Sequence, residues 1–270
     1  MKPRYIDIVK AEFKCFFTEF IRRKSLIIAL ILYPYILTAL ILFIGTIFGS
    51  PRYFREKIPA DPLLFFLSSS LTLLVSLVML DDIGARFIWE EQLGTLSYLM
   101  LMPAPMTKLI LASPIPRLVL TLGWVMLTLA PTAIYVKGVE TGIAIIIVSS
   151  IAALGALSLM GFALIIGGLL ILSKGEWAIY WIIRPLILFL SGVLYPVALM
   201  PLWLKVLSMT MPISYAVEAS RMLIAYDNPE IKLILLNIGL ILVLSILYTP
   251  IGLKTYKYLE LKVKRVGGLK

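Results

Sequence analysis

Long, uninterrupted stretches of apolar residues dominate the chain and predict helices that cross a membrane. The pattern gives six spans, over residues 25–48, 62–80, 108–136, 141–173, 177–194 and 232–253. A membrane helix needs about 20 apolar residues, and each stretch approaches or exceeds that length. Apolar residues run continuously here and do not alternate with polar ones, which favours helices over a β-barrel. The predicted fold class is all-α, a polytopic membrane protein with six transmembrane helices.

The residue pattern of the segment 1–24 predicts a helix of a different kind, one that lies along the membrane surface. Its apolar positions follow the helical repeat and are Ile6, Val9, Phe13, Phe16 and Phe20. Charged residues lie off this stripe, and a basic cluster at residues 22–24 ends the segment. An amphipathic helix with basic flanks is typical of an interfacial anchor. Contact with a soluble partner is the alternative role.

The segment 89–105, between the second and third spans, is also amphipathic. Its predicted apolar face is Trp89, Leu93, Leu96 and Met100, and its predicted polar face is Glu91, Thr95 and Tyr98. Pro103 and Pro105 are expected to end the helix, because proline removes a backbone donor. Such a helix can present its polar face to a water-soluble protein. A solvated interfacial loop without a partner is the other interpretation.

Residues 195–227 are too apolar for an ordinary loop and too interrupted for a span. They contain Pro196, Pro201 and Pro212, followed by Glu218 and Arg221. A re-entrant or outer-surface helical hairpin fits this pattern, provided that protein covers its backbone.

Four residues within or at the ends of spans are candidates for a substrate path. They are Tyr33, Tyr35, Arg184 and Tyr195. The two tyrosines flank a proline that can kink the first span, although ordinary helix packing is the favoured explanation for them. Arg184 lies seven residues into the fifth span, where an arginine either serves a function or extends to the lipid headgroups.

Charge and composition narrow the functional classes. Of the 270 residues 61% are hydrophobic and 15% are charged, and the net charge is +10. Lysine and arginine concentrate beside the spans, especially in a basic tail at residues 254–270, so membrane topology explains them and no nucleic-acid partner is expected. The chain has one cysteine, Cys15, and no histidine. Zinc sites and histidine-dependent triads are therefore excluded, and neither a metal nor an enzymatic activity is expected.

The distribution of basic residues also predicts the orientation. With both termini cytoplasmic, sixteen of the 25 lysines and arginines fall on the inner side and seven on the outer side. Arg117 and Arg184 lie within spans. This excess of inner positive charge favours cytoplasmic termini and a cytoplasmic 89–105 segment.

Several segments, in their order along the chain, are similar to the ABC-2 type transporter permeases. The sequence 90–96, Glu-Glu-Gln-Leu-Gly-Thr-Leu, followed by an apolar turn and Pro103, resembles their loop between spans two and three. Residues 191–196, 199–204 and 211–221 resemble their outer re-entrant region. The likeness covers nearly the whole chain. Gln92, Leu93 and Ser97 stand where the family often has charged residues, so the side chains that pair with a partner are open.

The resemblance implies a multi-pass permease in the cell membrane that works as a dimer with a second copy or a paralogue. Separate ATPase subunits would bind ATP and Mg, and the chain itself contains no phosphate-binding loop motif. Coupling to the ATPase is expected through Glu90, Glu91, Gly94, Thr95, Leu96, Tyr98 and Pro103. The expected function is export of an amphipathic or hydrophobic substrate. A regulatory or scaffold membrane subunit is the alternative, and an intramembrane enzyme is disfavoured because no carboxylate pair lies within a span.

Overall fold

The computed structural model describes residues 4–23, 60–95, 106–172, 177–194 and 196–265, together with 98–99 and isolated positions between 25 and 43. The helices and helical turns are α1 (Tyr5–Arg22), α4 (Pro62–Met79), the π-turn η1 (Leu80–Gly84), α5 (Arg86–Gln92), α7 (Met106–Ala112), α8 (Pro114–Lys137), η2 (Val139–Thr141), α9 (Gly142–Leu172), α10 (Trp177–Leu190), η3 (Val197–Leu199), α11 (Leu202–Met209), α12 (Pro212–Ile224) and α13 (Ile231–Arg265). Within this part of the chain every regular element is helical. The all-α prediction is thereby confirmed.

Four helical segments in the described ranges are long and apolar enough to cross a membrane. They are Pro62–Gly84, Met106–Lys137, Val139–Leu170 and Ile231–Tyr258. They coincide with the predicted second, third, fourth and sixth spans, and α7 and α8 meet at Ser113, just before the two prolines that interrupt the third. The protein is therefore a helical membrane protein. The predicted first span, 25–48, lies largely outside the described residues.

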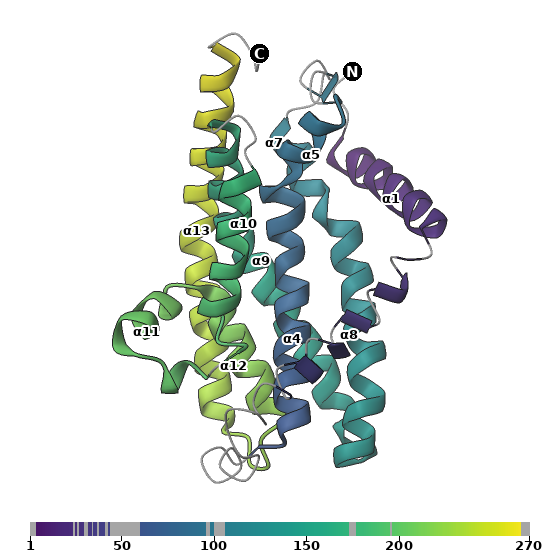
Figure 1. Cartoon of the computed structure of the whole chain (residues 1–270), viewed down its shortest axis with the longest axis vertical. Helices are drawn as coiled ribbons and strands as arrows, with labels where there is room; N and C mark the ends of the chain where they lie inside the picture. The colour runs from purple at the N-terminus through teal and green to yellow at the C-terminus, as the bar shows by residue number, and fades with distance from the viewer. Residues whose placement is uncertain are drawn as a thin grey trace.

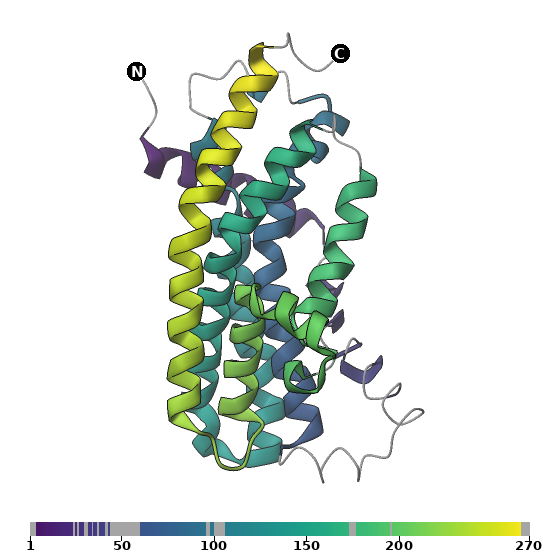
Figure 2. The same ribbon diagram turned by 90° about the vertical axis from the view of Figure 1, so that its left-hand side faces the viewer.

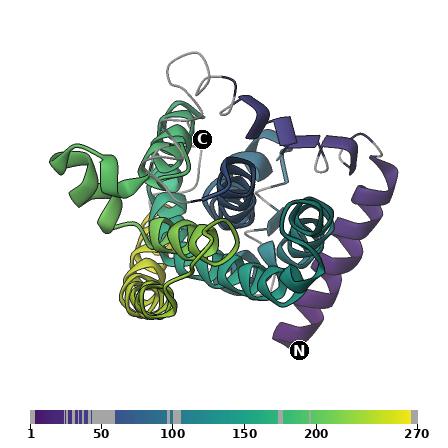
Figure 3. The ribbon, with the colours of Figure 1, turned by 90° about the horizontal axis from the view of Figure 1, so that it is seen from below.

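Helix α4 lies at the centre of the bundle, in contact with α8, α9 and α12 (Figure 3). Its hydroxyl-bearing residues face the interior, and each hydroxyl donates to a main-chain carbonyl of the preceding turn. These residues are Ser68, Ser69, Ser70, Thr72 and Ser76. Back-bonding of this kind satisfies the polar groups without partners from another helix, which is why a serine-rich helix can be fully buried.

Helix α13 packs along α9, and the two backbones touch where two glycines meet. A Cβ atom built on Gly252 would lie 2.2 Å from the carbonyl oxygen of Gly161, and one built on Gly161 would lie 2.4 Å from the carbonyl carbon of Tyr248. Only glycine fits at such a contact, as is usual where membrane helices approach closely.

The predicted fifth span, 177–194, is wrong in its extent. Helix α10 ends at Leu190 and has 14 residues, which at 1.5 Å per residue cover about 21 Å of a hydrocarbon core that is about 30 Å thick. A turn follows, with Gly192 at a φ of 77°. In Figure 1, α10 occupies the upper part of the bundle and α12 the lower part, while α11 projects sideways between them. We call these two short helices half-helices, because each covers only part of the height of the bundle; Figure 3 shows them offset from each other and not on one line.

The prolines of the 195–227 region mark helix starts. Pro196 and Pro201 immediately precede η3 and α11, and Pro212 is the first residue of α12. Proline suits these positions because its missing N–H would have no partner inside the helix anyway. The two helices of the predicted hairpin are present, but α12 is a core element, with nine of its residues buried, and not a surface helix.

Side chains of α11 and α12 close the break between the half-helices. The carbonyl of Leu190, at the end of α10, accepts hydrogen bonds from Ser208 Oγ at 2.7 Å and Ser214 Oγ at 2.8 Å. The carbonyl of Gly192 accepts one from Arg221 Nη2 at 2.7 Å. Backbone groups freed inside a membrane protein must find internal partners, and these donors supply them.

Arg221 is fully buried, and its charge is compensated within the bundle. Its Nη1 lies 3.2 Å from a carboxylate oxygen of Glu218, and its Nε donates to Ser69 Oγ at 3.2 Å. The guanidinium carbon sits 4.2 Å from the centre of the Phe65 ring, a cation–π contact. The predicted outer residues Glu218 and Arg221 therefore stabilise the core beside the helix break.

The two ends of the bundle differ. At the lower end in Figure 1, Lys137 Nζ donates to the carbonyls of Ala225 (3.0 Å) and Tyr226 (2.7 Å), which ties α8 to the turn before α13. Burial raises the pKa of the Tyr226 phenol, with a smaller contribution from the Glu218 charge, so this group stays neutral at physiological pH. Helix α1 and the C-terminal end of α13 lie toward the opposite end, as Figures 1 and 2 show.

Helix α1 lies on the outside of the bundle, in contact with α7 and α8 (Figure 3). The predicted helix is confirmed over Tyr5–Arg22. Four of the five predicted apolar positions are partly or fully buried, whereas Ile6 is exposed.

Candidate functional site

The end of the bundle that carries both termini holds a cluster of charged residues, organised by a change of helix type. After Met79 the central helix α4 widens into the π-turn Leu80–Gly84, and two aspartates occupy it. π-turns in helices frequently mark functional sites. Asp82 pairs with Arg117 of α8 at 2.5 Å, and Asp81 pairs with Arg184 of α10 at 3.3 Å. One turn of the central helix is therefore bonded to two neighbouring helices.

Arg86, the first residue of α5, pairs with two glutamates. Its Nη2 lies 3.3 Å from the Glu12 carboxylate of α1, and its Nε lies 2.8 Å from Glu90, one turn further along α5 itself. All three side chains are mostly buried, so the pairs are screened less by solvent than surface pairs would be. The same arginine thus joins α1 to the start of α5 and braces Glu90.

The predicted single helix over 89–105 is wrong in its continuity. Helix α5 ends at Gln92, and Leu93 and Gly94 form a turn in which Gly94 has a φ of 69°. Thr95 then folds back on the helix: its N–H donates to the Glu90 carbonyl at 3.0 Å, and its hydroxyl bonds to the Glu90 carboxylate. A left-handed glycine ends helices very commonly, because it avoids the Cβ clash of other residues.

The predicted coupling residues therefore divide into two groups. Glu90, Gly94 and Thr95 form the folded turn, while Glu91 and Tyr98 lie on its outer side, together with Leu93. Leu93 is 70% and Tyr98 74% exposed, and Glu91 makes no side-chain bond to any residue that the structure describes. Leu96 and Pro103 lie outside the described residues. The turn thus presents one acidic and two large apolar or aromatic side chains at the end of the molecule.

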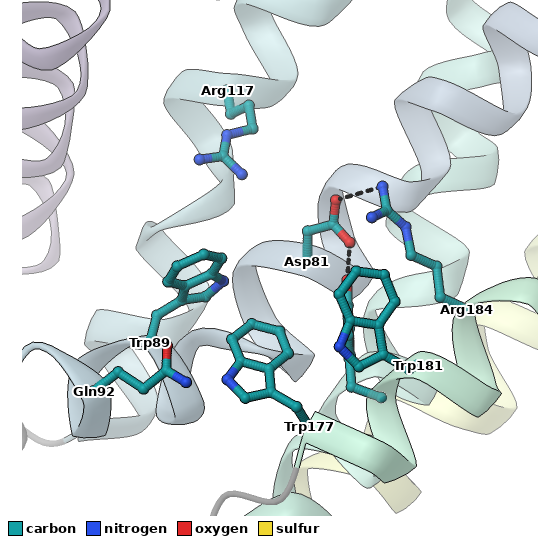
Figure 4. A pocket seen from close by; sticks show the side chains of 8 residues that line it. Asp81, Trp89, Gln92, Arg117, Trp177, Trp181 and Arg184 are labelled. Carbon is teal, nitrogen blue, oxygen red and sulfur yellow. Dashed lines mark hydrogen bonds and ion pairs between the residues drawn. The ribbon is translucent and has the colours of Figure 1, made fainter.

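Beside the charged cluster a cavity of about 600 Å³ opens between α5 and α10 (Figure 4). Its walls are Asp81, Trp89, Gln92, Arg117, Trp177, Tyr180, Trp181 and Arg184. The aromatic rings pack on one another edge to face, with Trp177 5.0 Å from Trp89 and 5.6 Å from Tyr180 between ring centres. The Tyr180 hydroxyl donates to Asp81, which also accepts from Arg184. This volume suits a small-molecule ligand.

Of the predicted substrate-path residues, Arg184 alone among those described lines this cavity. Tyr35 donates its hydroxyl to the Thr128 carbonyl of α8 at 2.9 Å, which is a packing contact. Tyr33 is exposed. Tyr195 lies outside the described residues.

Sequence reasoning did not single out Asp81, Asp82, Trp177 or Trp181, and it placed Trp89 only on the apolar face of the 89–105 segment. Trp177, Trp181 and Arg184 are spaced i, i+4 and i+7, so they share one face of α10. An aspartate pair at the end of an apolar span was the second available signal. Neither pattern alone shows that the two elements meet.

No protein-family model matches the chain, and a search of curated proteins finds no match. A functional assignment is therefore argued from the geometry of this end of the bundle.

Proposed function

We propose that this chain is the permease subunit of an ATP-binding cassette transporter, moving an amphipathic or hydrophobic substrate across the cell membrane with energy from separate ATPase subunits. The ABC-2 likeness of residues 90–103 and 191–221 supports the assignment. In this proposal residues 25–48 supply the first of six spans, and the half-helices α10 and α12 together supply the fifth. Both termini face the cytoplasm, as the distribution of basic residues favours.

The observation that carries the proposal is the attachment of one short, exposed turn to several long helices. The turn at residues 93–95, with Glu91 before it and Tyr98 after it, offers Glu91, Leu93 and Tyr98 as a docking surface. Its base is held by Arg86 through Glu90, and Arg86 also bonds Glu12 of α1. The adjacent π-turn is ion-paired to α8 and α10. A force applied to this turn by an ATPase would therefore act on α1, α8 and α10 at once.

Coupling through such a cluster needs an element with two packed arrangements. ATP binding would close two ATPase subunits and shift the docked turn relative to the bundle. The ion pairs of Asp81 and Asp82 would carry the shift to α10 and α8, because each pair joins the centre of the bundle to one neighbour. ATP and Mg would be bound by the ATPase, and a second copy or a paralogue of this chain would complete the dimer in the bilayer.

The alternative is a regulatory or scaffold subunit that docks the same ATPase without a transport path. The cavity of about 600 Å³ beside the docking turn favours the permease, because a scaffold needs no such space. Transport by reconstituted vesicles distinguishes the two, since a scaffold alone moves no solute.

Glu91→Lys tests the docking surface. It reverses the charge of a partly exposed side chain that has no bond to any described residue, so the fold should be retained. Co-expressed with an ABC ATPase from a neighbouring reading frame, where one is found, the wild-type chain should co-purify with that subunit and change its ATPase rate. The variant should lose co-purification by at least about tenfold, or keep it without altering the rate. Glu230→Lys, the same reversal at the opposite end of the bundle, should behave as wild type. Normal assembly and transport by Glu91→Lys would refute the docking assignment.

A further inference from the structure

The polar groups of the cavity between α5 and α10 are almost all hydrogen-bond donors. Two guanidinium groups, three indole N–H groups and the amide of Gln92 line it, while Asp81 is its one carboxylate. Guanidinium and indole groups donate and cannot accept. An occupant that satisfies these walls must therefore supply acceptor oxygens.

The single carboxylate is already in use. Asp81 accepts from the Tyr180 hydroxyl and from Arg184 Nη2. Arg184 makes no other hydrogen bond to a described residue; Arg117 pairs with Asp82 through Nη1, and its guanidinium carbon lies 5.7 Å from the centre of the Phe16 ring, a contact that uses no N–H donor. Each guanidinium carries five N–H donors, so most donors of both arginines remain available. Figure 4 shows the two arginines on opposite sides of the space in front of Asp81.

The charge of the walls does not oppose an anion. The lining residues carry two arginines and one aspartate, and Asp82, which bonds Arg117 from outside the lining, brings the cluster to a formal charge of zero. A cationic ligand would have to displace Arg184 or Tyr180 from Asp81, whereas an anion meets unused donors. Planar guanidinium groups bind phosphate and carboxylate oxygens in a two-pronged manner that further favours an anion.

The rest of the cavity is aromatic and continuous with the outer surface. Trp89 and Trp181 are 52% and 62% exposed, so their rings line the mouth, and Trp177 lies between them. Tryptophan is enriched at the interface between membrane and water. A ligand suited to that level has an apolar body and a charged end. The mouth therefore fits the chain of an amphiphile whose headgroup points inward.

We propose that this cavity binds an amphiphile with a phosphate or carboxylate headgroup, held between Arg117 and Arg184, with its apolar part against Trp89, Trp177 and Trp181. As a statement about cargo the inference rests on the proposed function, whereas the binding itself does not. Phosphate-bearing amphiphiles reach the site either from the bilayer, as anionic lipid, or as free solutes. The cavity supplies the same contacts to both.

The test uses the full-length chain alone, in nanodiscs of phosphatidylcholine, and an alkyl phosphate brominated along its chain. Bromine quenches nearby indoles, and the cavity holds three of the five tryptophans of the chain. We expect saturable quenching by the alkyl phosphate and none by a brominated alkyltrimethylammonium of equal length. Inorganic phosphate alone, used as a competitor at millimolar concentration, should displace little, because it lacks the apolar body.

Variants locate the headgroup. Arg184→Gln and Arg117→Gln should each weaken the apparent affinity at least about tenfold, the loss expected for a charge-assisted hydrogen bond. Arg184→Lys should lose less, because it keeps the charge. Lys232→Gln removes the same charge at the exposed start of α13 and should leave binding unchanged. If Arg184→Gln does not fold, Arg117→Gln on the opposite wall gives the same answer.

Equal quenching by the phosphate and ammonium probes, or full affinity in both arginine variants, would refute the site. Phosphatidylglycerol in the nanodisc distinguishes the two sources of ligand: competition identifies membrane lipid as an occupant, and lack of competition identifies a free amphiphile. No ATPase is present, so this experiment and the Glu91→Lys co-purification can fail independently.

Discussion

The contact between Gly161 and Gly252 gives the most quantitative prediction for the fold. Replacing Gly252 by alanine would put a Cβ 2.2 Å from the Gly161 carbonyl oxygen, whereas ordinary Cβ contacts begin at 3.4 Å. Backbone atoms cannot rotate out of the way as a side chain can, so α9 and α13 must separate locally by more than 1 Å. These two helices share an extensive interface, and the separation would loosen packing on both sides of the crossing.

The expected cost follows from two opposing terms. Overpacking of this kind costs up to about 3 kcal/mol, and alanine gains about 1 kcal/mol over glycine in a helix. The net destabilisation of Gly252→Ala is therefore about 2 kcal/mol, which corresponds to a fall in Tm of roughly 5 °C. Thermal unfolding in detergent, followed by far-ultraviolet circular dichroism, measures it.

Gly239→Ala is the matched control, because it lies on the same helix and a Cβ there meets nothing within 4 Å. Its Tm should stay the same or rise, since only the helix-propensity term applies. The reasoning fails if Gly252→Ala is as stable as Gly239→Ala, or if both variants fall equally.

Three further substitutions test the charged residues Arg221, Glu218 and Lys137. Arg221→Met should abolish folded protein almost completely, because it leaves Glu218 without its cation at a cost of about 3–5 kcal/mol. Glu218→Gln should reduce folding less. The yield of monodisperse protein after size-exclusion chromatography measures both effects. Lys137→Met should destabilise the turn at 225–230 by about 1–3 kcal/mol, because the hydrogen bonds from Lys137 Nζ to the carbonyls of Ala225 and Tyr226 are lost. Amide hydrogen exchange in this turn should become faster, with little change in α10. Unchanged exchange in the turn would contradict the assigned role.

Hydropathy alone was sufficient to predict four of the long helices. A run of about 20 apolar residues forms a helix in a bilayer, because its backbone N–H and C=O groups must hydrogen-bond to one another. The same rule predicts the wrong end for the fifth span, because the apolar run continues past Leu190 whereas the helix ends there. The turn there is stabilised by Arg221, 29 residues later in the chain, and no local pattern carries that information.

The candidate site shows the same limit. Helical periodicity across 89–100 was real, but Gly94 adopts a left-handed conformation and ends the helix, which periodicity cannot detect. The pairing of Asp81 with Arg184 joins residues 103 positions apart. The sequence indicates whether a residue belongs to a span or to a loop. The cavity depends on which spans pack side by side, and the sequence does not indicate that.

The shortness of α10 has a consequence for biosynthesis. A 14-residue helix that contains Arg184 and Pro185 is a weak signal for independent entry into a bilayer. Its arginine pairs with a carboxylate on η1, and its last carbonyl accepts hydrogen bonds from hydroxyls on α11 and α12. We therefore expect α10 to insert into the membrane only after α12 has left the ribosome. This half-helix would then pack directly against the partly assembled protein and not against lipid.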